Sequence, residues 1–230
     1  MRRLLPLLLL AGCAASPTPP GPPAHDYVFV FLRRGDAAAG LSDEQRQRVQ
    51  AAHLANIGRL AQAGQIVVAG PFGEGNPEPA LRGLFIFNVP SVAQAEELTR
   101  TDPAVQANVL VLEAHPFAST ADLPSLLARD LAARQKRLEA GDSSMAAGMR
   151  NYVVAIAEDA ERAGPLLDAD PHTRIAGRFG GDWADRGLWV LDFEDLAQAQ
   201  ALVLAFGEKA GPIQLYPWFG SEGIAMLEGP

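Results

Sequence analysis

The chain contains two long segments that read almost alike, and this internal repeat limits its possible folds more than any other feature. The first segment is "AGPFGEGNPEPALRGLFIFNVPSVAQAEEL" at residues 69–98, and the second is "AGRFGGDWADRGLWVLDFEDLAQAQAL" at residues 176–202. Further landmarks match in the same order: Tyr27 with Tyr152, Gly70 with Gly177, Phe72 with Phe179, Arg82 and Gly83 with Arg186 and Gly187, and Phe117 with Phe219. Matches in a constant order over this distance indicate two copies of one structural unit.

The same order of secondary structure is expected in both halves. In the first half, β-branched and aromatic runs predict strands beginning near residues 27, 66, 84 and 109, and Ser42 and Ser91 are the expected caps of two helices. Gln45 completes a capping box with Ser42. The second half repeats this order, although its first helix, near residues 165–169, is expected to be short and irregular. Each half therefore reads β-α-β-β-α-β.

This order predicts an α+β fold made of two ferredoxin-like repeats. Each repeat would form a four-stranded sheet with helices on one face only, which leaves the other face bare and apolar. Packing the two bare faces sheet to sheet buries both and gives a dimeric α+β barrel within one chain. We expect the barrel to enclose a small pocket, and we expect neither half to be stable alone.

Composition narrows the possible partners. The chain has 230 residues, of which 48% are apolar, as in a globular protein with a buried core. Its net charge of −8 and the lack of a basic stripe argue against nucleic acid as a partner. A monomer with an internal pseudo-dimer is the expected assembly.

The N-terminus predicts export and lipidation. "MRRLLPLLLLAG" at residues 1–12 has a basic start and an apolar run too short to span a bilayer, as in a signal peptide. Leu10 to Cys13 resemble the lipobox of bacterial lipoproteins, which implies cleavage before Cys13 and acylation of its thiol. An ordinary signal peptide with a chance Cys is the alternative. Ala14 and Ala15 follow the Cys, and by resemblance to the bacterial sorting rule they favour the outer membrane, facing the periplasm.

The remaining boundaries follow from composition. Residues 13–25 hold the Cys and a proline-rich tether, which can form neither a helix nor a sheet interior. Residues 26–118 form the first repeat and residues 148–230 the second. Between them, residues 119–147 contain the Ala- and Leu-rich segment "LPSLLARDLAARQKRLEAG", which predicts a connecting helix.

The first half resembles the YCII-related domain family of small dimeric α+β barrels. The likeness lies in "AHLANIGRLAQAGQIVVAGPF", "RGLFIFNVPSVAQAEELTRTDPAV" and "HPF", in this order. The resemblance implies a helical His, here His53, and a nearby Asp, here Asp102, as an active-site pair. One relative in that family acts as a dehydrochlorinase on a substituted hydroquinone. The second half lacks both residues, so it is a degenerate copy, and a single site is expected.

Three residues are the candidates for chemistry. Val49, Ile57 and Leu60 place His53 on the apolar face of its helix, where it could act as an acid or base or could be a core histidine bonded to a carbonyl. Asp102 precedes Pro103, which is typical of a helix N-cap and compatible with a site role. Arg82 could bind an anionic substrate, although its counterpart Arg186 favours a shared structural role.

Other known constellations do not fit the sequence. The four histidines have no metal-ligand spacing, and "FGSEG" lacks the order of a nucleophile elbow. The spacing of Gly70, Gly73 and Gly75 does not fit a dinucleotide-binding loop. No cofactor is therefore expected. The first hypothesis is a cofactor-independent lyase or isomerase acting on a small molecule, for example an aromatic one. The second is a lipoprotein that binds small molecules or serves as a scaffold without catalysis.

Overall fold

The structure is a computed structural model that describes residues 24–144 and 146–230. Cys13, the expected signal peptide and most of the expected tether lie outside the described residues. The first half comprises β1 (His25–Arg34), α1 (Asp43–Gln62), β2 (Ile66–Pro71), β3 (Leu81–Phe87), α2 (Val92–Thr99), α3 (Pro103–Gln106) and β4 (Leu110–Ser119). The strand β1 begins at His25, the last residue of the segment that the sequence assigns to the tether.

The second half has the same order of elements. It comprises β5 (Met149–Ala157), α5 (Ala160–Leu167), β6 (Thr173–Phe179), β7 (Gly187–Leu191), α6 (Leu196–Phe206) and β8 (Ile213–Ser221). Between the halves, α4 (Leu123–Glu139) forms the connecting helix. The expected short helix near residues 165–169 begins earlier than expected, because Asp159 caps it and accepts a hydrogen bond from the backbone of Arg162.

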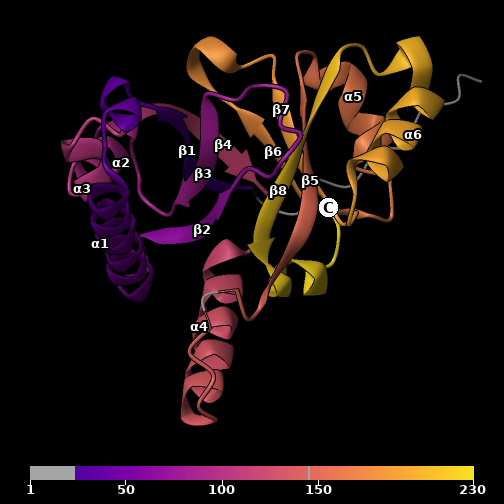
Figure 1. Ribbon diagram of the computed structural model, residues 1–230. Helices are drawn as coiled ribbons and strands as arrows, with labels where there is room; N and C mark the ends of the chain where they lie inside the picture. Colours follow the sequence, from indigo (N-terminus) through magenta and orange to yellow (C-terminus); the bar gives the residue numbers. More distant parts are fainter. Residues whose placement is uncertain (1–23, 145) are drawn as a thin grey trace, which may run out of the picture.

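All eight strands belong to one antiparallel sheet, in the order β2-β3-β1-β4-β6-β7-β5-β8. The first four strands and the last four have the same internal order, since β2, β3, β1 and β4 correspond to β6, β7, β5 and β8. Figure 1 shows α1, α2 and α3 on one side of the strands and α5 and α6 on the other, while α4 projects away from them. The predicted barrel of two ferredoxin-like repeats is confirmed.

Two short seams join the halves into a barrel. At the first, β4 pairs with β6 from Phe117 opposite Phe179 to Ser119 opposite Gly177. At the second, β2 approaches β8, where Phe72 forms an isolated bridge with Trp218. The outer strand of each half thus meets the edge of the other, and both free edges of the sheet are covered.

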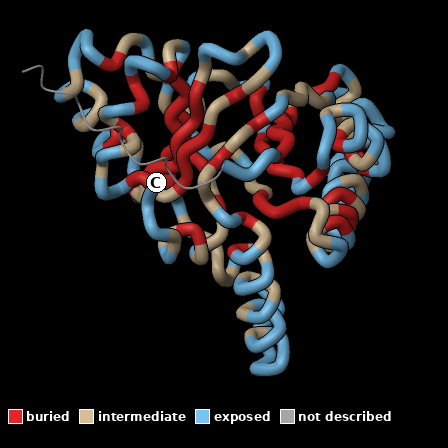
Figure 2. The backbone as a smooth tube through the Cα atoms, turned by 180° about the vertical axis from the view of Figure 1, so that it is seen from behind, coloured by how far each residue is buried: buried red, intermediate tan, exposed pale blue. Residues whose placement is uncertain are grey.

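The alternation of strand residues separates an inner core from two outer ones. In β1, Phe29 and Phe31 belong to a cluster that draws on both halves, whereas Val28 and Val30 belong to a cluster with α1 and α2. A third cluster packs the second half under α5 and α6. Figure 2 shows the buried residues concentrated in the strands, with the far end of α4 exposed. The inner core needs both halves, as expected for sheets packed face to face.

Two tyrosines close equivalent turns in the two halves. The hydroxyl of Tyr27 donates to the carbonyl of Ala121, 2.9 Å away, and accepts from the backbone of Leu123. The hydroxyl of Tyr152 donates to the carbonyl of Ser221, 2.8 Å away, and accepts from the backbone of Ala225. In both halves a tyrosine of the first strand therefore fixes the chain that leaves the last strand.

No helix within residues 24–144 and 146–230 is long and apolar enough to cross a membrane.

Candidate functional site

The fold brings His53 and Asp102 together from two separate helices. Ser42 caps α1 and forms the predicted capping box with Gln45, which sets the start of the helix. His53 lies on the buried face of this helix, with Asn56 and Leu60 on the same face. Asp102 is the predicted N-cap of α3, followed by Pro103. The loop between α2 and α3 carries Asp102 to the His53 ring.

The two side chains form a short, buried contact. Nδ1 of His53 lies 2.6 Å from Oδ2 of Asp102, and these residues are only 8% and 1% exposed. The other carboxylate oxygen, Oδ1, accepts from the backbone N–H of Ala104 at 2.9 Å. Asp102 therefore caps a helix and holds an imidazole at the same time, so the two roles considered for it coexist.

The contact also fixes which nitrogen of His53 can meet a ligand. An ionised carboxylate can only accept hydrogen bonds, so Nδ1 of the ring donates to it. In the neutral imidazole Nε2 then carries a lone pair and can accept a proton. The ring stacks on Phe85, with centroids 6.1 Å apart and an interplanar angle of 27°. A carboxylate, instead of a backbone carbonyl, is the partner of this histidine.

A second set of polar side chains links α1 to the loop that carries Asp102. The side-chain oxygen of Asn56 accepts from Arg59 at 2.7 Å and from the hydroxyl of Thr101 at 3.2 Å. Thr101 also accepts from Arg59 at 2.9 Å. Because Thr101 precedes Asp102, these bonds hold the carboxylate in position under the helix.

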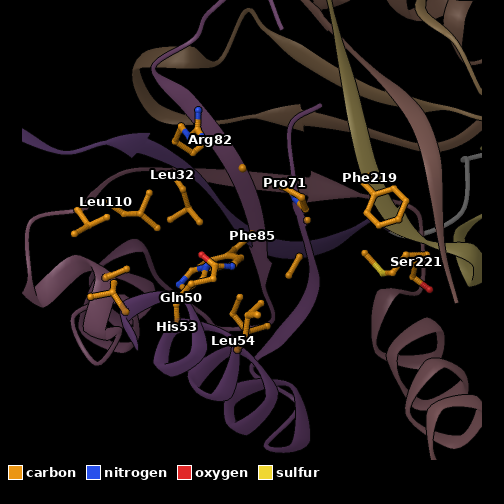
Figure 3. A pocket seen from close by; sticks show the side chains of 18 of the residues that line it. Leu32, Gln50, His53, Leu54, Pro71, Arg82, Phe85, Leu110, Phe219 and Ser221 are labelled. Atoms are coloured by element: carbon orange, nitrogen blue, oxygen red, sulfur yellow. The ribbon is translucent and has the colours of Figure 1, made fainter. Parts of the chain in front are cut away.

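His53 lines a cavity of about 790 Å³ between α1 and the outer face of the sheet. Its apolar lining includes Leu32, Leu54, Ile57 and Phe85, and it extends to Phe219 of β8 and to α4. Figure 3 shows Gln50, His53 and Leu54 on the helix side, Leu32 and Phe85 on the strand side, and Phe219 and Ser221 at the far end.

The position of this cavity corrects one expectation. We expected the barrel to enclose the pocket, but the inside of the barrel at this level is filled by aromatic rings. The centroid of Phe29 lies 5.6 Å from that of Phe117 and 5.4 Å from that of Phe179. The cavity lies instead on the outer face, where α1 stands over the sheet.

Arg82 lines the same cavity, as do Arg34 and Gln50. In Figure 3, Arg82 lies on the strand side, at the end of its strand away from His53. Arg34 and Gln50 were missed from the sequence, although the alternation in β1 places Arg34 on the same face as Leu32. The counterpart of Arg82, Arg186, instead stacks its guanidinium over the ring of Trp183 at 4.2 Å. The two arginines thus have different surroundings.

One carboxyl group of the cavity wall has a shifted pKa. Asp130 of α4 lines the far end of the cavity. Burial raises the pKa of this carboxyl group, and this effect outweighs the hydrogen bond and the nearby Arg129 and Arg137 that lower it. Asp130 is therefore more easily kept in its neutral form than an ordinary Asp.

The second half fills the equivalent space with a tryptophan. Trp189 occupies the position on β7 that Phe85 occupies on β3, and it is 0% exposed. Its indole N–H donates to Asp168 at 2.6 Å, and Arg178 also binds this carboxylate, at 3.0 Å. The first helix of this half has 8 residues, against 20 in α1. The His–Asp pair consequently has no counterpart there.

The described part of the chain contains no group of three or more His, Cys, Asp and Glu side chains that could hold a metal ion.

Comparisons with known proteins agree with this fold. Residues 27–117 match the family described as the YCII-related domain. A mutant chlorite dismutase from Candidatus Nitrospira defluvii superposes with a TM-score of 0.53 and 14% identity, covering 87% of this chain and 94% of that chain. The siroheme decarboxylase NirDL, in complex with an iron-uroporphyrin III analogue, gives 0.47 and 10%, covering 83% and 70%. No curated protein matches the chain.

Proposed function

Because residues 27–117 form a YCII-related domain, we propose that the chain is an enzyme that acts on a small molecule bound in the cavity beside His53. In this proposal His53 is the general acid and base, and Asp102 is a positioning residue. The reaction is a proton-transfer lyase or isomerase reaction on a molecule with an apolar, for example aromatic, body. The observation that carries the proposal is a buried His–Asp pair at the wall of a cavity.

The geometry supports proton transfer at Nε2. As a base, this nitrogen takes a proton from the substrate, and the ring becomes an imidazolium. The ionised carboxylate 2.6 Å from Nδ1 stabilises that positive charge and keeps the ring oriented. When the proton returns to another atom of the substrate, or to a leaving group, the same residue acts as the acid.

The cavity supports a substrate of modest size. Ligand pockets typically measure roughly 300–1,000 Å³ and are mostly apolar, with a few polar groups that orient the ligand. The cavity beside His53 lies within this range, at about 790 Å³. Phe85 and Leu32 offer an apolar surface to the body of the ligand, while His53 and Gln50 supply polar groups at one side.

A small-molecule screen by thermal shift tests the proposal. Compounds that stabilise the wild type, and not His53→Ala, bind at the site, and hydroxylated and halogenated aromatic compounds among them are then assayed for turnover. His172→Ala is the matched control, because His172 is exposed and does not line the cavity. Turnover that survives in His53→Ala would contradict the acid–base role.

The second candidate function is binding without catalysis. One observation favours it: the second half has the buried Trp189 at the position of Phe85 and no His–Asp pair, yet it forms the same order of strands. A binding protein would show ligands that stabilise the wild type, and none of them would be converted. Product analysis by mass spectrometry after long incubation separates the two candidates.

We further propose that the mature protein is a lipid-anchored protein of the bacterial cell envelope, attached through Cys13. The support is the L-A-G-C pattern at residues 10–13, followed by a proline-rich segment that can hold the domain away from a membrane surface. Metabolic labelling with palmitate, compared between the wild type and Cys13→Ser, tests this. Labelling that persists in the variant would contradict it.

A further inference from the structure

We infer that the cavity beside His53 selects an anionic ligand, an oxyanion on an apolar body, and that Arg34 and Arg82 bind the oxyanion. The inference rests on the proposed function in placing the ligand in the same cavity. It adds the chemical class of the ligand and gives Arg34 a role in binding it.

The charge of the cavity wall is opposite to that of the protein. The chain carries a net charge of −8, yet the charged side chains that line the cavity are Arg34, Arg46, Arg82, Arg134, Arg137 and Asp130. Five of the six are cations. A cleft lined by one sign of charge raises the local concentration of ligands of the opposite sign, so this cavity attracts anions.

Arg34 and Arg82 are the cations on the strand side of the cavity, and neither is held by an acidic side chain that the structure describes. Within the described residues neither side chain has a carboxylate within 4.0 Å, whereas the neighbouring Arg33 pairs with Glu78 at 3.2 Å and with Glu113 at 2.6 Å. Arg46 is already engaged, since its guanidinium donates to backbone carbonyls of the preceding loop. Among the described residues, three arginines of the cavity wall thus have no carboxylate within 4.0 Å, namely Arg34, Arg82 and Arg134, and the first two lie on the strands.

A β-bulge places Arg82 in the cavity wall. Leu32 pairs with Gly83 and Arg33 pairs with Leu81, so Arg82 is the additional residue in β3. Bulges redirect a side chain that regular alternation would send to the other face. Arg82 and Gly83 both line the cavity, while Leu81 and Leu84 on either side belong to the inner core.

The same strands bring Arg34 near Arg82. The backbone N–H of Arg34 donates to the carbonyl of Ala80, 2.6 Å away, at the end of β1 next to the start of β3. Guanidinium groups bind carboxylates and phosphates through paired N–H donors. Beyond them the cavity is lined by apolar side chains such as Leu32 and Phe85, which suit an apolar body.

The test compares benzoate and phenyl phosphate with benzamide, which has the shape of benzoate without its charge. We expect the two anions to bind the wild type more tightly than benzamide, and more weakly as the salt concentration rises. Arg34→Gln and Arg82→Gln should each weaken anion binding by about tenfold or more, as expected for the loss of a charge-assisted hydrogen bond. Calorimetry measures binding directly and needs no turnover.

Control variants make the outcomes distinguishable. Arg48→Gln removes an exposed cation of α1 that does not line the cavity, and it should bind benzoate like the wild type. The inference is wrong if benzamide binds as tightly as benzoate, if no anion binds, or if the Arg34 and Arg82 variants keep the wild-type affinity. It is also wrong if Arg134→Gln, at the α4 end, alone abolishes binding.

Failure of this inference differs from failure of the proposed function. If the arginine variants lose benzoate while His53→Gln leaves turnover unchanged, the anion site stands and the acid–base role fails. If His53→Gln abolishes turnover while the arginine variants bind anions normally, the acid–base role stands and this inference fails.

Discussion

Nδ1 of His53 lies 2.6 Å from Oδ2 of Asp102, although 49 residues separate the two in the chain. The contact is made where the buried face of a long helix meets the cap of a short one. The apolar face of α1 and the cap at Asp102 can each be predicted from the local sequence, but the contact between them depends on the fold.

Substitution of Asp102 should separate its two roles. Asn can still cap α3 through its side-chain oxygen, so Asp102→Asn should cost little stability, but it cannot stabilise an imidazolium as an ionised carboxylate does. Asp102→Ala removes both the cap and the buried partner of His53, and should destabilise by about 1–3 kcal/mol. Urea unfolding of both variants measures their stability. Equal losses of stability in the two variants would contradict the two separate roles of Asp102.

The two glycines at the seams should be equally intolerant of a side chain. A Cβ at Gly70 would lie 2.1 Å from the carbonyl oxygen of Phe219, and one at Gly177 would lie 2.0 Å from Cζ of Phe117. We expect Gly70→Ala and Gly177→Ala each to destabilise by about 1–3 kcal/mol, as overpacked sites do.

Gly58 in α1 is the matched control, because a Cβ there meets nothing within 4 Å. Gly58→Ala should stabilise by about 0.5–1 kcal/mol, the usual gain in a helix. Thermal unfolding compares the three variants. Seam variants as stable as the wild type would show that the halves are not held as closely as the structure indicates.

The equivalent residues Tyr27 and Tyr152 should contribute equally to the stability of the fold. Tyr27→Phe and Tyr152→Phe each remove a hydroxyl that makes two hydrogen bonds to the backbone. We expect a loss of about 1–3 kcal/mol in each case, because each leaves partly buried backbone groups without their partner. Chemical unfolding of the two variants should give similar values, and a large difference would argue against equivalent roles.

A pH-dependent contribution is expected from Glu113. Burial raises the pKa of this carboxyl group, but hydrogen bonds from Arg33 and His115 and their charges lower it by more, so the net pKa lies below the ordinary 4.5. A lowered pKa stabilises the fold above pH 4.5, and this contribution is lost as the pH falls through the folded-state pKa.

Glu113→Gln should therefore be less stable than the wild type at pH 7, by about 1 kcal/mol or less because the ion pair is partly exposed. The difference should narrow below pH 4.5. Unfolding measured from pH 7 downward tests the sign, and a difference that grows in acid would contradict it.

The fold could be predicted from the sequence because its signals are local and occur twice. Alternation in strands such as β1, caps such as Ser42, and the matched landmarks fix the order of the elements, and burial of two bare sheets then leaves few arrangements. The closeness of the seams could not be predicted, since it depends on Gly70 and Gly177 meeting residues far away in the sequence.

The candidate site could be predicted only in part. His53 was assigned to a buried helix face and Asp102 to a cap, but whether the two meet depends on the loop before Asp102. The position of the cavity outside the barrel depends on how the aromatic rings fill the interior. Arg82 faces the cavity through a bulge, and no pattern in the sequence marks that bulge.

The central claim is that Asp102 holds His53 with Nε2 free for a ligand, and NMR of the His53 ring tests it most directly. At about pH 8.5, where an ordinary imidazole is neutral, the nitrogen shifts should show the proton on Nδ1 in the wild type. A cavity ligand should then shift Nε2 more than Nδ1. A ring protonated at Nε2 under these conditions, or one that no cavity ligand perturbs, would contradict the claim.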